Sequence, residues 1–81
     1  MDMSFDVQVL DRDDNPVSGV EVKAIYPGFF KGGIQVVCTD ENGHAQFECT
    51  MTHPSAIFHC RGHRFGSYDL EDGSSFTLNL P

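Results

Sequence analysis

The segment 59–63, which reads His-Cys-Arg-Gly-His, holds the residue types best suited to chemistry in this chain. Imidazole and thiolate groups are the ligands that zinc prefers, and four of them can close a tetrahedral site. The other histidines and cysteines of the chain are Cys38, His44, Cys49 and His53. His59 and Cys60 are adjacent on an expected strand, however, so their side chains project to opposite faces. The chain also has no C-x-x-C pattern. We therefore interpret Cys38, Cys49 and Cys60 as core residues, since free cysteine packs as a small hydrophobe, and we expect no metal site.

Acidic residues gather in two expected turns, as Asp11, Asp13, Asp14, Asp40 and Glu41. If successive strands alternate in direction, the loops 11–16, 40–43 and 62–66 lie at one end of the domain, together with Arg61, His63 and Arg64. Three interpretations are open: solvated turn residues with partial ion pairing, a calcium site, or a polar partner surface. We favour the first, because Asp and Asn bond their own backbone in turns. The loop begins like an EF-hand, but Pro16 replaces the required glycine and no glutamate follows at the twelfth position.

Two aromatic residues, Phe29 and Phe30, lie at the tip of a glycine-bracketed loop over residues 27–33. They either fold back as a plug over the end of the core, which we favour, or are exposed anchors for a partner. Aromatic residues on adaptable loops are where binding energy concentrates. Lys31, His53 and the ring of Tyr26 could complete a shallow patch. The binding site predicted from the sequence is therefore Phe29, Phe30, Lys31 and His53.

Catalysis is not expected. A serine triad needs a serine, a histidine and an acid that converge, and no nucleophile elbow or glycine-framed serine is present. No sequence feature indicates a cofactor.

The elements that must position these residues are seven short strands. Alternation of apolar and polar residues predicts them over 5–9, 20–26, 34–39, 44–49, 55–61, 67–70 and 75–80. No segment shows sustained helical periodicity. The turn residues Asp40-Glu41-Asn42-Gly43 predict a central hairpin in which Val36 faces Phe47, Cys38 faces Ala45 and Ile34 faces Cys49. These six residues would form one apolar face.

Two segments also carry a family resemblance. Residues 15–22 (NPVSGVEV), followed by residues 39–47 (TDENGHAQF), resemble the first and central hairpins of two related modules. One is the bacterial immunoglobulin-like domain of the invasin and intimin type, and the other is the prealbumin-like carboxypeptidase regulatory-like domain. The resemblance covers roughly residues 5 to 62. It implies a seven-stranded antiparallel β-sandwich, immunoglobulin-like or prealbumin-like, and a role as spacer, adhesin stalk, folding partner or ligand-binding domain.

Composition limits the remaining classes. The 81 residues predict a single domain over 1–81, and 40% hydrophobic with 21% charged residues is typical of globular chains. A net charge of −7 argues against nucleic acid and anionic membranes as partners. No run approaches the ~20 apolar residues of a membrane helix, and the start lacks a secretory signal. Three cysteines without a disulfide framework favour reduced thiols in a cytoplasm.

These observations lead to one expectation about function. We expect a non-catalytic binding or assembly module whose partner is another protein or a second copy of the chain. A metal- or carbohydrate-binding sandwich is the alternative. Edge strands of an open sandwich can pair with a second chain, and so small a domain gains stability by association.

Overall fold

The computed structural model describes residues 3–26, 33–49 and 55–81, and these residues form seven β-strands. The strands are β1 (Met3–Leu10), β2 (Glu21–Tyr26), β3 (Gly33–Cys38), β4 (His44–Cys49), β5 (Ser55–Cys60), β6 (His63–Asp69) and β7 (Ser74–Asn79). Each predicted strand corresponds to one of them. The strand predicted over 67–70 begins earlier, at His63, because the preceding turn takes up only Arg61 and Gly62. No helix in the described residues is long and apolar enough to cross a membrane.

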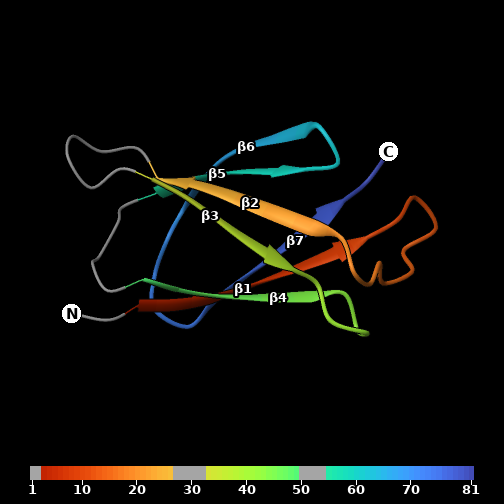
Figure 1. Cartoon of the computed structure of the whole chain (residues 1–81), viewed down its shortest axis with the longest axis horizontal. Coiled ribbons are helices and arrows are strands. Elements are labelled where there is room, and N and C mark those ends of the chain that lie inside the picture. The colour runs from red at the N-terminus through yellow and green to blue at the C-terminus, as the bar shows by residue number, and fades with distance from the viewer. Residues whose placement is uncertain (1–2, 27–32, 50–54) are drawn as a thin grey trace.

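The strands form two packed sheets, as Figure 1 shows. One sheet has three strands in the order β4-β1-β7, and the other has four in the order β3-β2-β5-β6. The predicted β-sandwich is therefore confirmed, but the prediction that it is antiparallel throughout is wrong, because β1 and β7 pair in parallel from Phe5↔Ser74 to Leu10↔Asn79. The reason is simple. Strands that alternate in direction along the chain give the first and the seventh the same direction, so they are parallel when the topology makes them neighbours.

The predicted central hairpin is wrong as well. The turn at 40–43 forms, with the Gly43 amide donating to the Asp40 carbonyl at 3.0 Å, but it joins two different sheets. The Thr39 amide donates to the Val20 carbonyl beside one sheet, whereas the Gly43 carbonyl accepts from the Val9 amide beside the other. β3 therefore pairs with β2, and β4 pairs with β1.

This crossing reverses the predicted face of β3. Ile34 and Val36 are 62% and 47% exposed, and Cys38 is exposed too, so the prediction that they lie in the core is wrong. Gln35 and Val37 are the half-buried positions of this strand. On β4 the prediction is confirmed for Ala45 and Phe47, which are fully buried.

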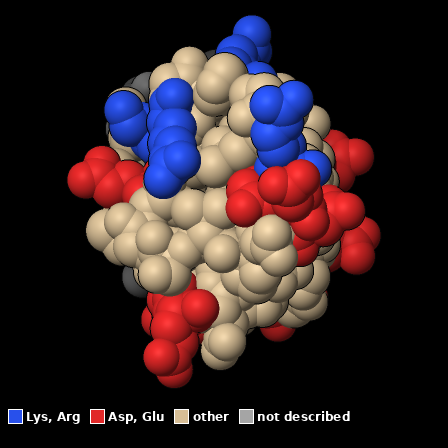
Figure 2. All heavy atoms as spheres, turned by 90° about the vertical axis from the view of Figure 1, so that its right-hand side faces the viewer, with Lys and Arg blue, Asp and Glu red and all other residues tan. Residues whose placement is uncertain are grey.

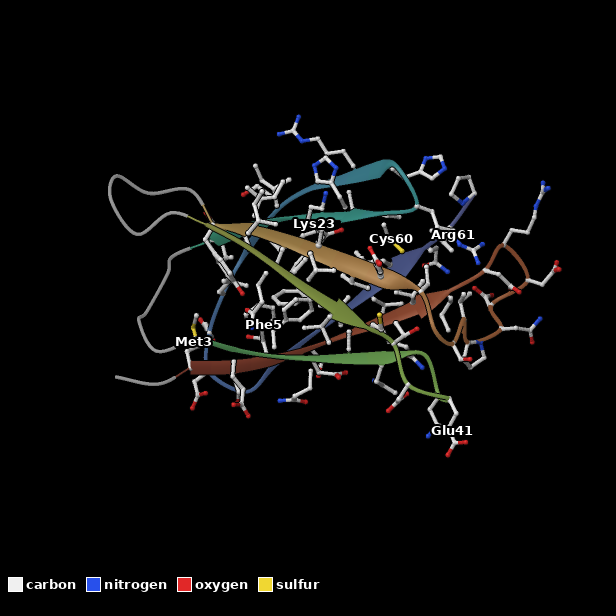
Figure 3. The ribbon with its side chains drawn as sticks, in the orientation of Figure 1. Met3, Phe5, Lys23, Glu41, Cys60 and Arg61 are labelled. Atoms are coloured by element: carbon white, nitrogen blue, oxygen red, sulfur yellow. The ribbon has the colours of Figure 1, made fainter. Side chains whose placement is uncertain are left out.

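The core lies between the sheets and is dominated by aromatic rings. Phe5 of β1 stacks on Phe47 of β4 with ring centroids 5.1 Å apart and an interplanar angle of 8°. Phe58 of β5 reaches across from the other sheet to within 5.9 Å of the Phe5 ring. Each such buried side chain contributes about 1.5–3 kcal/mol from the area it removes from water. The rings therefore fix the spacing of the two sheets, and Figure 3 shows Phe5 between them.

Candidate functional site

The outer face of the four-stranded sheet is where unusual side chains gather. On β2 the buried Val22 and Ala24 alternate with the exposed Lys23, so Lys23 and its same-face neighbours point away from the core. Across the strands, Ile25 is the register partner of both Ile34 and Ile57. Cross-strand partners on one face have Cβ atoms ~4.5–5.5 Å apart, so these side chains are neighbours. With Val36, the next outward residue of β3, they make an apolar patch consisting of Ile25, Ile34, Val36 and Ile57.

A second row of side chains crosses the same face beside the apolar patch. Lys23 is the register partner of His59, and His59 is the register partner of Arg64. Within the described part of the chain, none of these three side chains makes an ion pair. The charges of Lys23 and Arg64 on this basic row are therefore not neutralised by a neighbouring acidic side chain of the described residues. In the end-on view of Figure 2, Lys and Arg atoms gather in the upper half, with Asp and Glu below and to the sides.

A hollow of about 450 Å³ opens at the end of the basic row. Its wall is formed by the start of β2 and the end of β5, whose paired residues stop at Val22 and Cys60. The lining residues are Gly19, Val20, Glu21, Lys23, His59, Cys60, Arg61 and Gly62. Figure 3 shows Lys23, Cys60 and Arg61 along this side of the four-stranded sheet. The Cys60 side chain is buried in the core, and burial raises the pKa of its thiol, opposed by the positive charge of Arg61.

The lip of the hollow is the turn between β5 and β6. Arg61 and Gly62 have φ angles of 50° and 79°, which is the pattern of a two-residue hairpin turn with both residues left-handed. Gly and Asn suit such positions, and an arginine there costs about 1 kcal/mol in backbone conformation. A positively charged residue in a strained backbone conformation therefore lies at the edge of the hollow.

Strand β3 is the edge of the four-stranded sheet next to the apolar patch. Its six residues, 33–38, include no charged residue and no proline. By contrast β6, at the opposite edge, carries Arg64 and Asp69 and a pairing irregularity opposite Ile57 and His59. Charges and bulges are the usual devices that stop edge strands from pairing with other chains. Within the described residues, β3 has neither device.

Gln35 fixes β3 against the other sheet. Its side-chain amide donates to the Glu48 carbonyl of β4 at 3.2 Å, and its carbonyl oxygen accepts from the Tyr26 hydroxyl at 2.8 Å. The edge strand is therefore held in place from its inner face.

Two of the acidic loop residues, Asp11 and Asp40, bind the backbone of their own turns. The Asp11 carboxylate accepts from the amides of Asp13 and Asn15, and the Asp40 carboxylate accepts from those of Asn42 and His44. These bonds hold the pKa of both carboxyl groups below the ordinary value, mainly through the Asn15 amide at Asp11 and the His44 amide at Asp40. The prediction of turn residues is confirmed for Asp11 and Asp40, but within the described residues no ion pair joins the acidic loop residues to Arg61, His63 or Arg64. The described residues include no cluster of three or more metal-ligating side chains.

Strands that alternate in direction predict that three of the loops lie at the same end of the domain. The turns at 11–16, 40–43 and 61–62 lie at one end of the sandwich in Figure 1. The residues predicted as the binding site, Phe29, Phe30, Lys31 and His53, lie outside the described residues. Of the predicted core cysteines, Cys60 is buried, Cys38 is exposed, and the side chain of Cys49 lies outside the description.

The sequence did not reveal one side-chain contact between strands and one surface. His44 Nδ1 lies 2.7 Å from Asp6 Oδ2, which joins β4 to β1 on the outer face of the three-stranded sheet. The outer face of the four-stranded sheet was missed because β3 was assigned to the wrong partner. A signal for it is present in the sequence: Lys23, His59 and Arg61 all occupy outward or turn positions of predicted strands.

No protein-family model matches the chain, and no curated protein matches it.

Proposed function

We propose that this protein is a non-catalytic assembly module that pairs through strand β3 with the same strand of a second copy. The observation that carries the proposal is an edge strand with no charge and with Ile34 and Val36 exposed on it. An exposed apolar edge strand is a template for pairing with another chain.

A second copy of this chain is the partner that suits the β3 edge best. Two identical strands related by a two-fold axis pair antiparallel, and such an interface is self-complementary by symmetry. The chain carries a net charge of −7, so copies repel each other over most of their surface. β3 contributes none of that charge, and its pairing would merge the apolar patches of two copies. The four-stranded sheet would then continue as one eight-stranded sheet across the dimer.

The distribution of the strands over the two sheets favours one of the two resemblances, immunoglobulin-like or prealbumin-like, over the other. In an immunoglobulin sandwich of the constant type, the first two strands share a sheet. Here β1 lies in the three-stranded sheet and β2 in the four-stranded one. This arrangement supports the prealbumin-like carboxypeptidase regulatory-like resemblance over the immunoglobulin-like one. Modules of that type without a catalytic constellation are consistent with an assembly role.

Sedimentation velocity from micromolar to millimolar concentration tests the proposal. We expect the native chain to form a dimer and Val36→Lys to remain a monomer, because a charged lysine on an edge strand opposes pairing with another chain. The matched control is Thr77→Lys, which adds the same charge to the exposed face of another edge strand, β7, and should leave the dimer intact. A native chain that stays monomeric to millimolar concentration, or a Thr77→Lys chain that loses the dimer equally, would overturn the proposal.

A further inference from the structure

The hollow between the start of β2 and the end of β5 has features that the assembly role does not use. It lies beside the basic row, at the end of the four-stranded sheet where β2 begins and β5 ends. Its volume of about 450 Å³ falls in the range of small-molecule sites, which is about 300–1,000 Å³. The residues that line the hollow include two with a permanent positive charge, Lys23 and Arg61, and one with a negative charge, Glu21. Arg64 adds a further positive charge one strand away.

The surroundings of the hollow are basic, although the molecule as a whole is acidic. The chain has twelve acidic and five basic residues, yet three of the five lie at or beside this hollow. Within the described residues Lys23, Arg61 and Arg64 make no ion pair that would neutralise them. An anion in the hollow would supply the missing counter-charge.

Arg61 provides a second, independent observation. It occupies a left-handed backbone position where asparagine would be favoured, so the arginine is disadvantageous for the turn itself. Backbone strain of this kind concentrates at functional sites, where the side chain is needed for something other than folding. The planar guanidinium group donates two parallel hydrogen bonds to carboxylate and phosphate groups.

We propose that the hollow lined by Lys23, His59 and Arg61 is a binding site for an oxyanion group, a carboxylate or a phosphate. Arg61 binds the group from the lip, Lys23 supplies a point charge from β2, and the imidazole of His59 supplies an N–H donor between them. The proposal does not depend on the dimer, because none of these three residues belongs to β3.

The test is a titration of ¹⁵N-labelled protein followed by NMR, with inorganic phosphate in one arm and acetate in the other. Sodium chloride at matched ionic strength is the reference. We expect saturable shifts confined to the amides of residues 19–23 and 59–62. Tighter saturation by phosphate identifies a phosphate-bearing ligand, and tighter saturation by acetate identifies a carboxylate. Shifts that follow ionic strength alone, in both arms, would falsify the proposal.

A matched pair of variants separates the site from general electrostatics. Arg61→Asn should weaken binding by about tenfold or more, the effect of losing a charge-assisted hydrogen bond. The same variant should raise the midpoint of thermal unfolding, because asparagine suits the turn. Arg12→Asn removes the same charge from an exposed loop outside the hollow and should leave the affinity almost unchanged. Equal losses in the two variants would show that only net charge matters and would overturn the assignment.

Discussion

At the residue scale, Gly43 is the position where the turn between β3 and β4 meets the β1–β2 loop. Its φ is +79°, and a Cβ there would lie 2.9 Å from the Val9 carbonyl oxygen and 3.1 Å from the Val17 amide. Those two backbone groups are hydrogen-bonded to each other at 3.0 Å, so a methyl group would press on that bond. We expect Gly43→Ala to lower the free energy of unfolding by about 3 kcal/mol, from strain and displaced backbone together.

Gly73 offers the matched control for that substitution. Its φ is +83°, but a Cβ there meets nothing within 4 Å. Gly73→Ala should therefore lose only about 1 kcal/mol, the conformational part alone. Urea unfolding of both variants measures the difference, and equal losses would show that the close approach at Gly43 does not matter.

Asp40 makes stability depend on pH. The amides of His44 and Asn42 lower the pKa of its carboxyl group in the folded protein, so the charged form is favoured by folding. This stabilisation is present above the ordinary pKa of an aspartate and is lost as the pH falls through the lowered value, below about pH 4. We expect the melting temperature of Asp40→Asn to fall less than that of the native chain between about pH 5 and pH 2. Parallel melting curves for the two proteins over this interval would contradict the assignment.

At the scale of elements, Thr39 secures the point where the chain leaves one sheet for the other. It is buried, and its hydroxyl donates to the Val17 carbonyl at 2.7 Å while accepting from the Val20 amide at 3.1 Å. Thr39→Val keeps the shape but leaves both backbone groups unpaired, so we expect a loss of about 1–3 kcal/mol in unfolding free energy. Thr39→Ser keeps the hydroxyl and should lose less. If serine and valine are equally destabilising, the hydroxyl is not what holds the crossing.

The strands were predictable from the sequence because alternation and turn residues are local signals. The pairing was not. Asp40-Glu41-Asn42-Gly43 forms the turn that its residue types indicate, but the same turn chemistry serves a hairpin within a sheet and a crossing between sheets. The deciding contacts are those of Thr39 with Val20 and of Gly43 with Val9, which join segments distant in the sequence. Ile34, Val36 and Cys38 alternate as buried residues do, but β3 pairs with β2 instead of β4, so these three residues lie on the outer face of the four-stranded sheet.

The candidate site was hidden for the same reason. Lys23 and Arg61 come from separate strands, and no spacing rule brings them together before the β2–β5 register is known. Their outward alternation was visible, but it is also typical of a solvated face.

At the scale of the whole molecule, Cys38 and Cys60 report on two different events. Labelling of Cys38 reports on the native surface, and labelling of Cys60 reports on global opening. Cys38 is exposed on β3, whereas Cys60 is buried between the sheets, with the pKa of its thiol raised by burial. A thiol reagent requires the accessible thiolate. We expect peptide-level mass spectrometry to find Cys38 labelled at once in the native protein and Cys60 labelled only at the rate of global opening. Labelling of Cys60 that does not slow when the protein is stabilised would contradict this.

The parallel pairing of β1 with β7 has a consequence for biosynthesis. β1 is the central strand of its sheet, and one of its two neighbours is the last strand of the chain. On a ribosome β1 emerges first and β7 last, so one side of β1 remains without its partner for almost the whole of translation. The four strands of the other sheet emerge before β7, and their pairing does not require it. We expect the nascent protein to build the sheet that carries the hollow first and to close the sandwich only once β7 has left the exit tunnel.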